Sequence, residues 1–146
     1  MEAGALTALC IRSKAHWGYD DDFMRKSIPS LTITPSMIET ENVFVAEGSR
    51  GDIVGVATVE KLHSSGKFDL SRLFIDPAAI KTGIGRALFE AVAGFVKSEG
   101  CTCFSILSDP FAEPFYLRLG AVRVGDAPSD AIAGRTLPLL DYVVAR

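Results

Sequence analysis

The stretch Ile80-Lys81-Thr82-Gly83-Ile84-Gly85-Arg86-Ala87-Leu88 decides the fold of this chain. It follows an apolar run that is typical of a strand, and it leads directly into an amphipathic helix. The first N–H groups of a helix have no partner within it, and the helix dipole is positive at that end, so such a turn is a ready site for phosphate. Glycine removes the Cβ atoms that would keep phosphate from the backbone. The stretch therefore predicts a phosphate-bearing ligand; the alternative is an ordinary tight turn before a core helix.

Two common phosphate-binding patterns do not fit this turn. A Walker loop places its lysine after the glycines, whereas Lys81 and Thr82 precede both glycines here. A dinucleotide fingerprint needs Gly or Ala where this chain has Leu88, and it needs an acidic residue about 20 residues further on. Residues 101–107, which occupy that place, contain no acidic residue.

The 146 residues are expected to form one domain, residues 1–146, because no linker or repeat interrupts the sequence. Hydrophobic periodicity predicts helices near residues 3–14, 20–30, 34–41, 83–100 and 113–119, the second of them stopped near Pro29. Alternating patterns predict strands at 43–46, 53–62, 68–75, 101–107, 121–125 and 135–144, with turns at 48–52 and 63–67. The fold class is thus mixed α/β: a largely antiparallel sheet with one parallel β-α-β crossover between 68–75 and 101–107.

Charge, apolar runs and cysteine content narrow the kinds of partner and ligand that this protein is expected to bind. Fifteen basic and eighteen acidic residues give a net charge of −3, and no basic stripe forms, so no nucleic-acid partner is expected. No run approaches the roughly 18–20 apolar residues of a membrane span, so no membrane partner is expected. The three cysteines have no partner cluster of Cys or His, which favours free thiols in the cytoplasm and predicts no metal site.

A second pattern follows the glycine turn: Asp109-x-x-Ala112-x-x-Phe115-Tyr116-x-x-x-Gly120. With the strand, glycine turn, helix and strand before it, this pattern resembles the GNAT superfamily of acetyl-CoA-dependent N-acetyltransferases. The resemblance covers the chain from about residue 43 onward, and residues 70–124 carry it most specifically. Two positions depart from the family pattern, because Ile80 replaces a polar residue and Asp109 replaces asparagine.

The resemblance implies how acetyl-CoA would bind. The strands 70–75 and 101–107 would splay apart, the backbone of Leu73 and Ile75 would pair with the pantetheine arm, and the Leu73 N–H would polarise the thioester carbonyl. Backbone N–H groups from Lys81 through Ala87 would hold the pyrophosphate, with Arg86 adding charge. The predicted cofactor-binding residues are Leu73, Phe74, Ile75, Ile80, Lys81, Thr82, Gly83, Ile84, Gly85, Arg86, Ala87, Asp109 and Phe115.

Two residues are predicted to be catalytic. Tyr116 stands where the family places its general acid, and a phenol of pKa about 10 can protonate a thiolate whose thiol has a pKa near 8.5. Asp69 is the predicted base, since some relatives that acetylate lysine carry glutamate on the same strand; alternation places it on the same face as Leu73, and Glu60 is the second candidate. The alternatives are a buried core aromatic for Tyr116 and a solvated strand residue for Asp69.

The acceptor site is predicted around His16, Trp17 and Tyr19, because the segment between the first two helices often walls the acceptor pocket in this superfamily. The acidic run at residues 20–22 would attract a cationic amine. The alternative is a hydrophobic plug followed by an acidic helix start that favours the helix dipole.

The predicted function is N-acetyl transfer from acetyl-CoA to a primary amine, of a small molecule or a protein, by direct attack in a ternary complex. Two alternatives stay open: a non-catalytic acyl-CoA-binding or sensor domain, and an interaction module in which the glycine turn is only structural. Family members usually begin with a strand, whereas the first element predicted here is a helix. An open sheet edge would need covering, and the resemblance makes a homodimer plausible.

Overall fold

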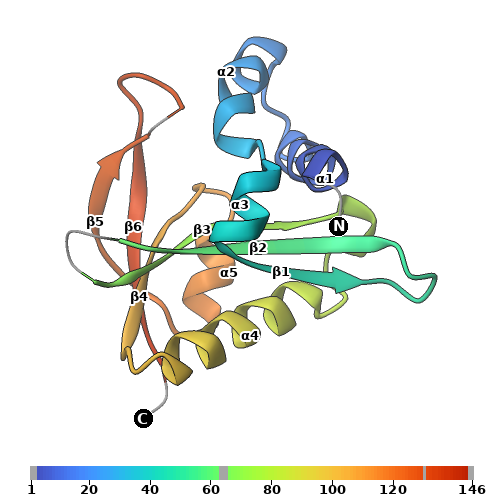
Figure 1. Ribbon diagram of the computed structural model, residues 1–146. Coiled ribbons are helices and arrows are strands. Elements are labelled where there is room, and N and C mark those ends of the chain that lie inside the picture. Colours follow the sequence, from blue (N-terminus) through green and yellow to red (C-terminus); the bar gives the residue numbers. More distant parts are fainter. Residues whose placement is uncertain (1–2, 63–65, 130, 145–146) are drawn as a thin grey trace.

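The computed structural model describes residues 3–62, 66–129 and 131–144. Figure 1 shows an open sheet with helices on both sides. The helices are α1 (Ala3–Ala15), α2 (Asp21–Leu31), α3 (Pro35–Thr40), α4 (Ile84–Ser98) and α5 (Glu113–Arg118), with a 3₁₀ turn at Pro77–Ala79. The strands are β1 (Asn42–Glu47), β2 (Ile53–Lys61), β3 (Phe68–Ile75), β4 (Cys103–Leu107), β5 (Val122–Pro128) and β6 (Thr136–Val143). The turn predicted at 63–67 lies partly outside the described residues.

The strands form one sheet in the order β1-β2-β3-β4-β6-β5. Among the described residues β3 and β4 are the single parallel pair, and α4 is the helix that connects them. Every other pairing is antiparallel. The predicted mixed α/β fold with one parallel crossover is therefore confirmed.

Each face of the sheet has its own core. On one face α4 buries Leu88, Phe89 and Val92 against the strands, and α5 adds Tyr116. On the other face α1 buries Leu6 and its neighbours against β2 and the segment that follows α2. In Figure 1 the helices α1 to α3 lie on one side of the strands and α4 lies on the other. The sheet is thus a partition between two helical layers.

The parallel pair opens soon after it forms. Only Phe68↔Phe104 and Asp69↔Ser105 are paired between β3 and β4. Beyond these pairs β4 stays bonded to β6 and β3 stays bonded to β2. The splay predicted from the resemblance is present, and it leaves an opening within the sheet.

A β-bulge in β3 changes which side chains share a face. Leu70 pairs with Val59 and Arg72 pairs with Thr58, so Ser71 is an extra residue with no partner across the ladder. Its hydroxyl donates to the Thr58 carbonyl at 3.1 Å. Because the extra residue reverses the alternation, Asp69 and Leu73 lie on opposite faces, and the prediction that they share a face is wrong.

The second helix, predicted over residues 20–30 and stopped near Pro29, is present as Asp21–Leu31. Pro29 lies inside α2, which continues to Leu31. Proline removes one helical donor, but the carbonyls near this end have other partners: Thr32 Oγ1 donates to the Ile28 carbonyl at 2.7 Å and Arg72 Nε donates to the Ser30 carbonyl at 3.1 Å. Burial of Leu31, which is 2% exposed, holds the final turn on the core.

Candidate active site

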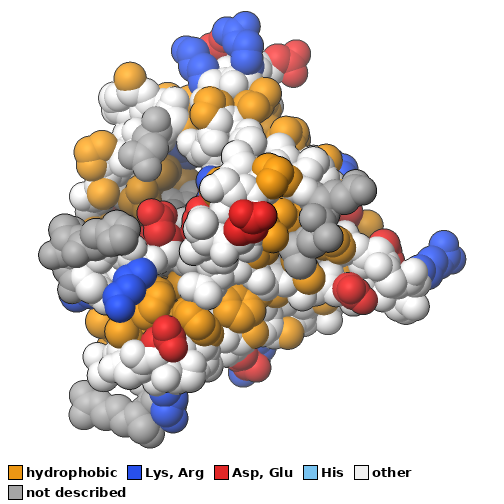
Figure 2. Space-filling model, in the orientation of Figure 1, with side chains coloured by type: hydrophobic (Ala, Val, Ile, Leu, Met, Phe, Trp, Pro, Cys, Tyr) orange, Lys and Arg blue, Asp and Glu red, His pale blue; other side chains and the backbone are white. Residues whose placement is uncertain are grey.

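A cavity of about 670 Å³ lies at the opening between β3 and β4. Its wall comes from β3, the glycine turn, α5, the loop after β4, the end of α1 and the segment between β5 and β6. Figure 2 shows the surface hollowed between α2 and the β5–β6 hairpin, with charged side chains gathered at the tip of α2. The predicted site residues that line the cavity are Trp17, Asp69, Leu73, Phe74, Ile75, Ile80, Lys81, Gly83, Gly85, Arg86, Asp109, Phe115 and Tyr116.

Five predicted residues do not line it: His16, Tyr19, Thr82, Ile84 and Ala87. The Thr82 hydroxyl donates to the Ala79 carbonyl, and the Ile84 side chain packs against the main core. The structure thus places these two side chains in the scaffold of the turn.

The glycine turn presents a row of backbone donors. Gly83 has φ +86° and precedes α4 without a side-chain cap. Within the described residues, the backbone N–H groups from Lys81 to Arg86 donate to no other group of the protein, whereas the Ala87 N–H donates to the Gly83 carbonyl at 3.0 Å. The donors available for an anion therefore end at Arg86, whereas the prediction extended them to Ala87.

The two glycines serve different purposes. A Cβ on Gly83 would meet open space, so this glycine is required by its left-handed backbone. A Cβ on Gly85 would come within 3.2 Å of Phe115 Cζ. Gly85 thus allows close contact between α4 and α5, which carries Phe115 next to Tyr116. Arg86, on the same turn, pairs with Glu90 at 3.0 Å and remains exposed.

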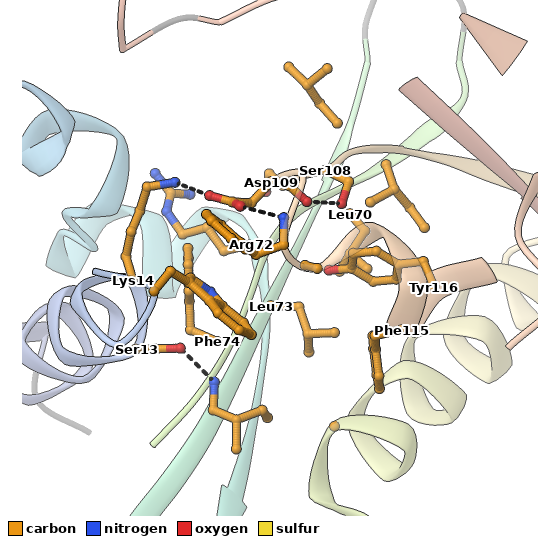
Figure 3. A pocket seen from close by; sticks show the side chains of 18 of the residues that line it. Ser13, Lys14, Leu70, Arg72, Leu73, Phe74, Ser108, Asp109, Phe115 and Tyr116 are labelled. Carbon is orange, nitrogen blue, oxygen red and sulfur yellow. Dashed lines mark hydrogen bonds and ion pairs between the residues drawn. The ribbon is translucent and has the colours of Figure 1, made fainter. Parts of the chain in front are cut away.

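The edge of β3 offers further backbone donors to the cavity. The Ile75 N–H donates to Ser13 Oγ of α1 at 3.3 Å (Figure 3). N–H groups two residues apart in a strand point to the same side, so the Leu73 N–H faces this edge as well. The end of α1 therefore engages one of the two backbone donors that were predicted to pair with pantetheine.

Tyr116 projects from α5 into the cavity wall and is 5% exposed. The centroid of its ring lies 6.1 Å from that of Phe89 and 5.2 Å from that of Phe115. Within the described residues its hydroxyl makes no hydrogen bond. Burial raises the pKa of Tyr116, and the negative charges of Asp109 and Asp69 raise it further. The phenol is therefore kept protonated and is available as a donor.

Asp69 lies at the start of the opening, where β3 and β4 are still paired. Ser105 Oγ donates to Asp69 Oδ1 at 2.7 Å, which fixes the carboxylate. Asp69 is the cross-strand partner of Glu60, and both side chains line the cavity. The two candidate bases are therefore neighbours on one face of the sheet. The negative charge of Asp69 also raises the pKa of Tyr116.

Asp109 is engaged by the protein itself. Its Oδ2 accepts hydrogen bonds at 2.8 Å from both Lys14 Nζ and Tyr19 Oη, and its Oδ1 accepts from the Phe111 N–H at 2.9 Å. Burial raises the pKa of Asp109, but the Lys14 ammonium and these donors outweigh burial and hold the pKa below its usual value. The carboxylate therefore ties α1 to the loop before α5, where a contact to the cofactor had been predicted.

The aromatic cluster after α1 divides between two roles. Trp17 lines the cavity and stacks on Phe111, with ring centroids 5.4 Å apart and an interplanar angle of 7°. His16 packs edge-on against Trp17 and is exposed. Tyr19 stacks on Phe23 and donates a hydrogen bond from its hydroxyl to Asp109. Burial and this hydrogen bond raise the pKa of Tyr19 to about 12. Of the three residues predicted for the acceptor site, Trp17 alone reaches the cavity.

Sequence reasoning missed several wall residues, above all Ser13, Lys14, Phe111 and Arg135. Lys14 and Asp109 are 95 residues apart in the chain, and Tyr19 and Arg135 are 116 apart. No local pattern indicates such pairs. The one available signal was the replacement of the family's asparagine by Asp109, which calls for a cation nearby.

Within residues 3–62, 66–129 and 131–144, no group of three or more His, Cys, Asp or Glu side chains could hold a metal ion. None of the helices described is long and apolar enough to cross a membrane.

Residues 19–131 match the Acetyltransferase (GNAT) domain family. No curated protein matches the sequence. Among solved structures, an aminoglycoside 6′-N-acetyltransferase complexed with coenzyme A is similar with a TM-score of 0.71 and 16% identity, over 99% of this chain and 91% of that one. A GCN5-related N-acetyltransferase from Rhodopseudomonas palustris has a TM-score of 0.77 and 15% identity, over 97% and 89%. For nourseothricin acetyltransferase these values are 0.65 and 21%, over 72% and 66%, so this chain spans just under two thirds of that protein.

Proposed function

Since the chain belongs to the GNAT acetyltransferase domain family, we propose that it transfers an acetyl group from acetyl-CoA to a primary amine. Membership of this family makes the protein an acyltransferase. Our proposal is that the acceptor of the acetyl group is an amine. Direct attack of the amine in a ternary complex fits the site, because one cavity joins the phosphate turn, the β3 edge and both candidate catalytic residues.

The residues of the cavity fit acetyl-CoA. The N–H groups from Lys81 to Arg86 would hold the pyrophosphate at the positive end of α4. The β3 edge would bind the pantetheine arm as an added strand, with the Leu73 N–H at the thioester carbonyl. For this the Ile75 N–H would exchange Ser13 for the arm. When bound, acetyl-CoA supplies an activated acetyl group on a thiol that leaves readily.

The protein would supply two proton movements. Asp69 would take a proton from the ammonium group of the acceptor, directly or through a water, so that the neutral amine can attack the thioester; Ser105 holds the carboxylate of Asp69, and Glu60 lies beside it. Tyr116 would donate its proton to the departing sulfur as the C–S bond breaks. The nitrogen that has formed the new C–N bond then releases its second proton to solvent, and Tyr116 regains a proton from solvent. The observation that carries the proposal is Tyr116, whose ring is buried in the cavity wall while its hydroxyl makes no hydrogen bond within the described residues and stays open to the cavity.

Release of free thiol from acetyl-CoA, measured with a panel of primary amines, tests the proposal. We expect release that depends on both the enzyme and the amine, with the acetylated amine confirmed by mass spectrometry. Binding of acetyl-CoA without release for any amine would favour the non-catalytic sensor. Absence of binding would favour the interaction module, in which the glycine turn is structural.

A cytoplasmic location, a homodimer and the absence of nucleic-acid and membrane partners stay predictions. The exposed Val122 and Val124 on the edge strand β5, with Val143 on β6, support an interface between copies. Sedimentation of the purified protein would decide between monomer and dimer.

A further inference from the structure

The wall of the cavity around Asp109 carries more positive than negative charge. Asp109 Oδ2 pairs with Lys14 Nζ at 2.8 Å, and the same oxygen accepts from Tyr19 Oη, which in turn accepts from Arg135 Nη2 at 3.0 Å. Lys14 pairs directly with this carboxylate, whereas Arg135 is linked to it only through the Tyr19 hydroxyl. Within the described part of the chain Arg135 forms no ion pair of its own, so this wall has an excess charge of about +1 that a bound anion would balance.

Arg135 is held in place before any ligand binds. Its guanidinium carbon lies 4.8 Å from the centroid of the Phe23 ring and 5.4 Å from that of Tyr19. Among the described residues, the guanidinium group makes a single hydrogen bond, which it donates to the Tyr19 hydroxyl. Guanidinium has five N–H donors in a fixed plane, so most of them remain for a ligand, and the aromatic support removes much of the entropy cost of fixing the side chain.

Arg135 lies on the face of the sheet that carries α1 and α2, because it contacts Tyr19 and Phe23. Leu137 and Leu139 of β6 share a face with Asp141, which pairs with Ser105 beside Asp69. Arg135 immediately precedes β6 and lines the same cavity. Along this face Asp69 and Asp141 therefore lie at one end, and Arg135 lies at the other.

We propose that the acceptor is an amine that carries a carboxylate, and that Arg135 binds this carboxylate. This inference rests on the proposed function and names its substrate class. The planar fork of arginine matches a carboxylate with two parallel hydrogen bonds. The amine of the same molecule lies toward Asp69 and Glu60, so the charges of the substrate and of the cavity are matched end to end (Figure 3 shows the cavity between Lys14 and Tyr116).

Matched acceptors test the proposal. The acceptors are α-amino acids and ω-amino acids of increasing chain length, each compared with its own amide, which keeps the amine and the size but removes the negative charge. We expect kcat/KM to favour the acid over the amide by about 10- to 100-fold, as for hydrogen bonds to a charged group. In Arg135→Gln this ratio should fall to near 1. A merely structural role of Arg135 would lower both rates together and leave the ratio unchanged.

Trp17 provides a second readout that needs no turnover. It is the only tryptophan of the chain and it lines the cavity, so its fluorescence reports acceptor binding directly. Arg25→Gln is the matched control, because Arg25 pairs with Asp22 on the exposed face of α2, away from the cavity. Equal binding of acids and amides, or better binding of amides, would overturn the proposal. Acetyl-CoA titrated separately shows whether the proposed function itself has failed.

Discussion

Replacing Asp109 with asparagine tests the charge network that ties α1 to the loop before α5. Asp109 and Lys14 side chains are each 14% exposed and lie 2.8 Å apart. The amide keeps the size of the carboxylate and can still accept from the Phe111 N–H. It removes the negative charge, so Lys14 would lose its ion-pair partner and Arg135 would lose the anion on the far side of the Tyr19 hydroxyl.

The expected cost follows from the burial of the pair. Removing one partner of a fully buried ion pair costs about 3–5 kcal/mol, and removing one of an exposed pair costs about 0–1 kcal/mol. With both side chains 14% exposed and one hydrogen bond retained, we expect Asp109→Asn to lower the free energy of unfolding by about 2–3 kcal/mol. In a domain of this size the midpoint would fall by about 4–12 °C.

Urea denaturation of a double-mutant cycle measures the coupling. Asp109→Asn, Lys14→Met and the double variant should give a coupling of at least about 1 kcal/mol, because Lys14→Met removes the charge that Asp109→Asn leaves unpaired. The folded-state pKa of Asp109 is lowered, so its contribution is present above the unfolded value near 4 and is lost as pH falls through the folded pKa. The difference in stability between wild type and Asp109→Asn should therefore hold at neutral pH and close in acid. A coupling near zero, or a difference independent of pH, would refute this reasoning.

Two further predictions concern the catalytic residues. Tyr116→Phe should lower kcat by about 10²- to 10⁴-fold, the range for a general acid, while acetyl-CoA affinity and stability stay nearly unchanged because the hydroxyl loses no protein partner; loss of acetyl-CoA binding in calorimetry would instead indicate a packing role. Asp69→Asn should lower kcat/KM for amines by a similar factor at neutral pH, and the difference from wild type should narrow as pH rises, since more of the amine is already deprotonated. A difference that stays constant across the pH profile would argue against Asp69 as the base.

The sequence predicted the parts of this protein that depend on local patterns. The strand–turn–helix around Gly83 and the short helix with Tyr116 appear where the periodicity and glycines place them. The fold class followed because a helix between two strands forces a parallel crossover. These features rest on interactions within a few residues of one another.

The errors share a different cause. The bulge at Ser71 depends on the pairing of β3 with β2, and no residue within β3 signals it. Arg135 was missed because its partner Tyr19 lies 116 residues away. Alternation and propensity cannot report contacts that form only when distant segments meet.

Thermal unfolding with and without acetyl-CoA tests the central claim most directly, with NAD and ATP as controls. At about 100 times its dissociation constant, a ligand that binds only the folded protein adds roughly 2.7 kcal/mol to the free energy of unfolding. For this chain length the account predicts a rise of about 5–10 °C in the midpoint with acetyl-CoA and a much smaller rise with NAD or ATP. No rise with acetyl-CoA, or an equal rise with all three ligands, would contradict an acetyl-CoA site between the glycine turn and the edge of β3.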